Sequence, residues 1–149
     1  KSEMGLNTKV LFQPYGYLKI IEIFIDVACI IMVRLVPTGL GHATTMGIDY
    51  LAATTLNGGI IIALMILICF LKGHMQIQET LLEYILHILM SLLHLMLAIV
   101  LLVKYGPNTD YTRADVPVGM LAVITSCLCV VNCFVFATDA VIVSRHTQF

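Results

Sequence analysis

The sequence contains very few charged residues. Only 11% of its 149 residues are charged, 60% are hydrophobic, and the mean hydropathy is +0.99. Soluble domains have roughly 25% charged and about 45–50% apolar residues, so this chain lacks the polar surface that a soluble globule needs. The net charge is −1 and no basic patch is present, which argues against nucleic-acid binding. The composition indicates a membrane protein, whose solvent is hydrocarbon.

The sequence also lacks the common signatures of enzymes and secreted domains. It has no phosphate-binding glycine motif, nucleophile elbow or metalloprotease signature. It has no Asn-x-Ser/Thr sequon, and its five cysteines all lie within apolar runs, which excludes a disulfide between the loops. We therefore predict a protein that is not an enzyme and has no cofactor.

Four apolar runs are long enough to cross a membrane. They cover residues 15–36, 51–71, 81–103 and 117–143, and a spanning helix needs about 20 such residues. Backbone groups in lipid must be satisfied within the segment, so the runs are predicted to be helices. The predicted fold class is all-α: a transmembrane four-helix bundle with short loops, forming a single domain over 1–149.

The basic residues outside the runs predict the orientation. Lys1, Lys9, Lys72 and Arg145 belong to one side, whereas Arg34, Lys104 and Arg113 lie on the other beside Asp49, Asp110 and Asp115. The positive-inside rule then predicts an integral membrane protein with both termini in the cytoplasm. We expect it in the plasma membrane.

Polar side chains recur on one face of three of the runs. In "YLKIIEIFID", Lys19, Glu22 and Asp26 are three and four residues apart, which places them on one side of a helix. The third run repeats this spacing with Glu83, His87, Ser91 and His94, and the fourth contributes Asn132 and Asp139. A charge in hydrocarbon is costly, so each should face a partner or water. We predict a polar network that points into the bundle.

The helical rise of 1.5 Å per residue assigns these groups to levels. Lys19 and Asp139 fall roughly 6 Å from the inner end, Glu22 and His87 roughly 10 Å, and Asp26, His94 and Asn132 roughly 16–20 Å. The predicted pairs are Lys19 with Asp139, Glu22 with His87, and Asp26 with His94 or Asn132. Glu83 is expected to reach interfacial water.

Several roles are open for this network. It can fix the pairing and register of the helices, or it can relay protons or ions. A zinc site would use Glu22, Asp26, His87 and His94, but no dense ligand motif is present. A lipid or small-molecule site is a further alternative. We predict the structural role and no metal, with proton or ion conduction as the main alternative.

Small residues form stripes that would let helices approach closely. The second run has Thr55, Gly59 and Ala63, each four residues apart. The fourth run has Gly119, Ala122, Ser126, Cys129, Cys133, Ala137 and Ala140, at steps of three or four. We predict helix-packing seams on both faces, within the bundle or against another copy. The expected partners are membrane lipids, and either further copies of the chain or other membrane proteins.

Two stretches carry a resemblance to a known group. They are "YGYLKIIEIFIDVACIIMVR" and "VGMLAVITSCLCVVNCFVFATDAVIVSRH". In these, and in its four spans with short loops, the chain resembles the small MARVEL-type four-span proteins and is similar in pattern to the insect Snakeskin-like membrane proteins. The resemblance implies a structural role at epithelial junctions or in organising plasma membrane, and it implies no catalytic residues.

Overall fold

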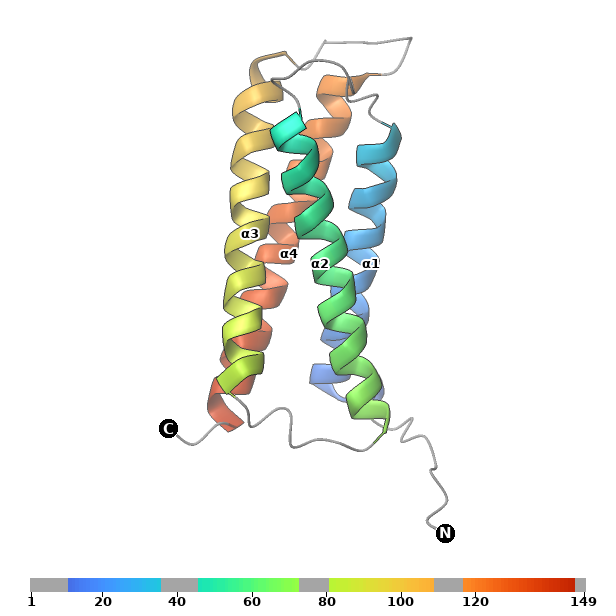
Figure 1. The fold of residues 1–149 in the computed structure, drawn as a ribbon, viewed down its shortest axis with the longest axis vertical. Helices are drawn as coiled ribbons and strands as arrows, with labels where there is room; N and C mark the ends of the chain where they lie inside the picture. Colours follow the sequence, from blue (N-terminus) through green and yellow to red (C-terminus); the bar gives the residue numbers. More distant parts are fainter. Residues whose placement is uncertain (1–10, 36–45, 73–80, 109–116, 147–149) are drawn as a thin grey trace.

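The computed structural model describes residues 11–35, 46–72, 81–108 and 117–146, and these residues form helices that run side by side (Figure 1). The elements are α1 (Pro14–Leu35), α2 (Met46–Leu71), α3 (Leu81–Tyr105), the short 3₁₀ helix η3 (Gly106–Asn108) and α4 (Val118–His146). The predicted all-α class is confirmed. The loops between the helices, both tails, and with them Lys1, Lys9, Asp110, Arg113 and Asp115, lie outside the described residues.

α2, α3 and α4 are longer than the apolar runs that predicted them, whereas α1 has the same length as its run. α2 begins at Met46 instead of residue 51, α3 extends to Tyr105, and α4 extends to His146. Hydropathy marks only the part of a helix that is apolar, and it falls where polar residues such as Lys104 enter. The backbone hydrogen bonds of a helix continue through such residues, so the helix extends beyond its apolar run.

Each helix packs against its neighbours in the chain, and α1 also packs against α4. α1 and α3 therefore lie on one diagonal of the bundle, and α2 and α4 on the other. α1 and α3 begin at the same end of the bundle, where α2 and α4 end (Figure 1). We call this end the Pro14 end. A side chain that points inward can thus meet groups from all four helices.

Three of the helices are long and apolar enough to cross a membrane: α2, α3 and α4. These helices indicate an integral membrane protein. α1 differs because it carries Lys19, Glu22 and Asp26, but all three side chains are fully buried. Its exposed positions include Phe24 and Ile31, so the outward face of α1 is as apolar as those of the other helices.

The half of the bundle away from the Pro14 end has an apolar core. Its members come from all four helices: Cys29, Ala52, Leu56, Leu97, Ala98, Leu101 and Cys129. α3 and α4 approach closely there, because the Ser126 hydroxyl donates to the Ala98 carbonyl at 2.8 Å. Nearer the middle, the Ser91 hydroxyl donates to the Cys133 carbonyl at 3.0 Å. Small side chains that hydrogen-bond across a seam allow this packing.

Candidate functional site

The polar side chains that the sequence analysis singled out lie inside the bundle. Ser91 is half-buried, and the other eight are each at most 2% exposed. Seven of these eight, all but Glu83, form two groups. The first group, the Lys19 cluster, consists of Lys19, Glu22, His87 and Asp139. The second, the Asp26 triad, consists of Asp26, His94 and Asn132. Both groups combine residues of α1, α3 and α4, so both link helices across the α1–α3 diagonal.

The Lys19 ammonium is the centre of its cluster. It donates to Glu22 Oε2 at 3.0 Å, one helical turn away on α1. It also contacts Asp139 Oδ2 on α4 and His87 Nε2 on α3. An ammonium group has three hydrogens to donate, and here it has one acceptor from each of three helices. Glu22 and His87, predicted as a direct pair, are instead joined through Lys19.

The ring orientation of His87 explains how it takes part. Its Nδ1 lies 2.6 Å from the Glu83 carbonyl oxygen, which can only accept, so Nδ1 carries a hydrogen. Nε2 then offers its lone pair to the Lys19 ammonium. Asp139 Oδ2 lies 3.1 Å from the same nitrogen. We interpret this short distance as a consequence of the shared donor: His87 Nε2 and Asp139 Oδ2 both accept from the Lys19 ammonium group.

Glu83 differs from the expectation. We expected its carboxyl group to reach interfacial water, yet its side chain is only 2% exposed. The expectation considered only how close Glu83 lies to the end of α3. Glu83 is one turn before His87 on the same side of the helix, so its side chain points into the bundle. The residue belongs to the protein interior, and its backbone carbonyl holds the His87 ring.

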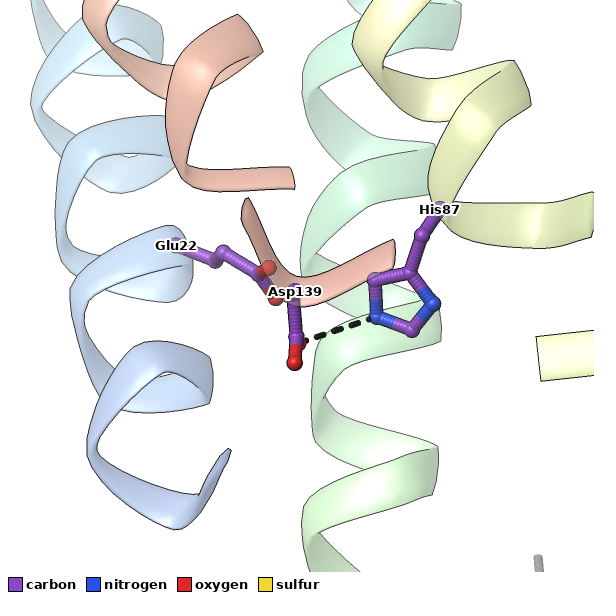
Figure 2. A group of neighbouring side chains, drawn as sticks. All are labelled: Glu22, His87 and Asp139. Atoms are coloured by element: carbon purple, nitrogen blue, oxygen red, sulfur yellow. Dashed lines mark ion pairs between the residues drawn. The ribbon is translucent and has the colours of Figure 1, made fainter. Parts of the chain in front are cut away.

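Three members of the Lys19 cluster, Glu22, His87 and Asp139, have the arrangement of a cation site (Figure 2). The ligand atoms of Glu22, His87 and Asp139 lie within 4.8 Å of one another, and the three side chains converge from different helices. Such a set could hold a metal ion, but the Lys19 ammonium contacts all three groups. The protein's own cation thus occupies the position between the ligands. The zinc set considered from sequence is divided, because Asp26 and His94 belong to the other group.

The Asp26 triad has short, direct contacts. His94 Nε2 and Asn132 Nδ2 each lie 2.8 Å from Asp26 Oδ1. Asn132 Nδ2 is also 3.2 Å from His94 Nε2. One carboxylate oxygen from α1 is therefore shared by an imidazole of α3 and an amide of α4.

The geometry of His94 implies that the pair with Asp26 holds one proton. His94 Nδ1 lies 2.8 Å from the Met90 carbonyl oxygen, so Nδ1 carries a hydrogen. A neutral ring would then turn the bare lone pair of Nε2 toward Asp26 Oδ1. That contact is attractive only if a hydrogen lies between the two atoms, as a protonated carboxyl group or as an imidazolium. In either form the pair has no net charge, which lowers its cost in a nonpolar interior.

Gly59 brings the fourth helix to the triad. A Cβ atom at this position of α2 would collide with Asp26 Oδ2 and would lie 3.4 Å from His94 Cε1. Only glycine lets the carboxyl group rest directly against the α2 backbone. The residue was singled out for helix packing, and what packs against it is the Asp26 carboxyl group together with the edge of the His94 ring.

Phe136 separates the two polar groups, and the sequence analysis missed it. Its side chain is fully buried, with its ring centroid 5.1 Å from that of His94 and 6.0 Å from that of His87. The Lys19 Nζ lies 6.0 Å from the ring centroid. Phe136 is four residues after Asn132 and three before Asp139, so the spacing that placed those two on one face also places Phe136 between them.

The small-residue positions lie mostly inside the bundle. The buried ones are Thr55, Gly59, Ala63, Gly119, Ala122, Ser126, Cys129 and Ala140, while Cys133 and Ala137 are half-buried. Of the α4 stripe, Ser126 and Cys133 have hydrogen-bond contacts with α3 of the same chain. This seam therefore serves the bundle itself.

Comparisons of the chain with protein families, with curated proteins and with solved structures find no match.

Proposed function

We propose that this protein is a structural integral membrane protein. It would pack laterally with itself or with partner membrane proteins and so organise a region of membrane or a cell junction. In this proposal it performs no chemical reaction, needs no cofactor or metal, and presents its apolar outer surface to lipids and to other spans.

One observation carries the proposal: the polar side chains point inward and bind one another. Lys19 bonds to groups of α1, α3 and α4, and Asp26 bonds to α3 and α4 while resting on α2. The outward positions include many large apolar residues such as Phe134 and Met65. A network whose members bind one another across the helices fixes the helices in one register, which is the property a rigid structural unit requires. Within the described residues, four of its oxygens, Glu22 Oε1, Asp26 Oδ2, Asn132 Oδ1 and Asp139 Oδ1, have no hydrogen-bond partner.

The same observation supports α1 as a fourth span. A helix of 22 residues is about 33 Å long, enough for a hydrocarbon core of about 30 Å. Its charges are buried against α3 and α4, so lipid would meet only apolar side chains. We propose that both termini are cytoplasmic, because the basic residues favour the Pro14 end as the inner one, and that the protein belongs to the plasma membrane. The resemblance to MARVEL-type and Snakeskin-like proteins agrees with this role.

The proposal is tested by extracting the protein from membranes in a mild detergent and measuring the mass and composition of the particle. We expect a particle that contains several copies of the chain, or the chain with other membrane proteins. A single copy surrounded only by detergent and lipid, under conditions that keep a known membrane oligomer intact, would contradict the proposal.

A second candidate is a proton or ion pathway. It is favoured by the exchangeable proton between His94 Nε2 and Asp26 Oδ1 and by the carboxyl groups of the Lys19 cluster. Two features oppose it. The Phe136 ring lies between the two polar groups, and beyond the Asp26 triad the core around Cys29 and Leu97 is apolar.

A further inference from the structure

We infer that the outward face of α2 around Asn57 is a self-association surface whose occupant is α2 of a second copy of this chain. The inference rests on the proposed function, since it names the surface through which lateral packing with itself would occur. The amide of Asn57 carries the argument, because it is a polar group on the outside of an apolar helix.

Asn57 lies near the middle of its helix. At 1.5 Å per residue it is about 16 Å from Met46 and about 21 Å from Leu71. It is also only two residues from Gly59, which packs against the Asp26 carboxyl group. Asn57 is nevertheless exposed, as are Tyr50 and Ile61 above and below it on the same face. In a membrane-spanning α2 the amide would lie inside the hydrocarbon core, roughly 10 Å from the nearer end of the apolar span Tyr50–Leu71.

The bundle satisfies only part of this amide. Asn57 Nδ2 donates one hydrogen to the Ala53 carbonyl at 2.7 Å. Within the described residues, its second N–H and its Oδ1 have no partner in the protein. The exposed hydroxyls of Thr54 and Thr138 differ, because each has one hydrogen and donates it to a carbonyl of its own helix. An unmet amide donor and acceptor in hydrocarbon costs free energy that a partner can recover.

A second copy of the same helix fits these unmet groups. An amide is complementary to itself, because the N–H of each side chain can donate to the Oδ1 of the other. Such reciprocal pairing is what a twofold axis produces, where the same patch meets itself. Ala53 and Thr54, both exposed beside Asn57, are small enough for the two backbones to approach.

The test measures energy transfer between copies labelled at the C-terminus with donor and acceptor fluorophores, over a series of protein-to-lipid ratios in liposomes. For Asn57→Leu we expect the protein-to-lipid ratio at half-maximal energy transfer to rise on the order of tenfold, which means weaker association, since one or two interhelical hydrogen bonds are lost. Asn57→Gln keeps an amide and should stay within a fewfold of the wild type. Thr138→Val is the matched control, because it removes an exposed polar group from α4 and should leave transfer unchanged.

Folding is checked separately by the thermal unfolding midpoint, which Asn57→Leu should not lower because the side chain is exposed. Energy transfer that is equal in wild type and Asn57→Leu would overturn the assignment of this surface to self-association, and it would leave the proposed function unaffected. Detergent particles that hold one copy of the chain with other membrane proteins would do the same. A wild type that neither shows transfer nor co-purifies with other membrane proteins would overturn both.

Discussion

Lys19 shows how a single residue can compensate several buried polar groups. Its ammonium has three hydrogens and three acceptors, on Glu22, His87 and Asp139. One positive charge faces two carboxyl groups, so the cluster is neutral when one of the two carries a proton. A charge that is removed from solvent is costly unless a partner compensates it. Within the described residues Glu22 Oε1 and Asp139 Oδ1 have no hydrogen-bond partner, so each carboxyl group contacts Lys19 through its other oxygen. Each acceptor therefore depends on Lys19 more than on any other neighbour in the cluster.

This dependence predicts strong coupling between Lys19 and Asp139. Lys19→Met and Asp139→Leu should each lower the free energy of unfolding by about 3–5 kcal/mol, because each removes one partner of a buried ion pair. The double variant should lose clearly less than the sum of the single losses, since both members are then apolar. Thermal unfolding in detergent measures all three variants. Lys72→Met, at an exposed lysine beyond α2, is the control and should behave as wild type. Losses that simply add would contradict the pairing.

At the scale of elements, the packing of α1 against α2 depends on the absence of a side chain. Asp26 on α1 reaches the backbone of α2 at Gly59, where a Cβ atom would collide with its Oδ2. The adjacent Gly58 faces Met90 of α3, where a Cβ atom would lie 3.9 Å from the methyl carbon, an ordinary contact. Two consecutive glycines thus have different roles, and only one of them is needed for the α1–α2 approach.

The two glycines provide a matched pair of substitutions. Gly59→Ala should destabilise the bundle by about 1–3 kcal/mol, because the added methyl group displaces Asp26 from its position or forces the helices apart. Gly58→Ala should be neutral or stabilising by up to ~1 kcal/mol, since alanine favours a helix more than glycine does. The thermal midpoints of both variants in the same detergent decide the matter. Equal midpoints would show that Asp26 does not rest on α2 at Gly59.

At the scale of the whole molecule, the sequence predicted the depth of each polar residue along the bundle axis better than it predicted which residues are in contact. The helical rise alone placed Lys19 with Asp139, and Asp26 with His94 or Asn132, and the structure has all three contacts. The direct pairing of Glu22 with His87 and the exposure of Glu83 differ, because a level along the axis says nothing about the rotation of a helix about it. Phe136 was missed because a phenylalanine in an apolar run carries no signal of its own.

The positions of the two polar groups also predict what the molecule does not do. Phe136 lies between them, and the core beyond the Asp26 triad is built from residues such as Leu56, Leu97 and Leu101. A proton would have to cross both apolar regions to pass from one end to the other. We therefore expect the protein to be a poor proton conductor although it holds a proton between Asp26 and His94.

The test uses liposomes that contain the protein and a pH-sensitive dye, with a pH gradient imposed across the membrane. In the wild type the gradient should decay at the rate of protein-free liposomes, and Asp26→Asn should not change that rate. Asp26→Leu should lower the free energy of unfolding by about 1–3 kcal/mol, because it leaves His94 Nε2 and Asn132 Nδ2 without their shared hydrogen-bond partner. Asp26→Asn keeps an amide that can donate to His94 Nε2 and should lose less. A gradient that collapses with the wild type and persists with Asp26→Asn would identify the Asp26 triad as part of a proton path and replace the structural role.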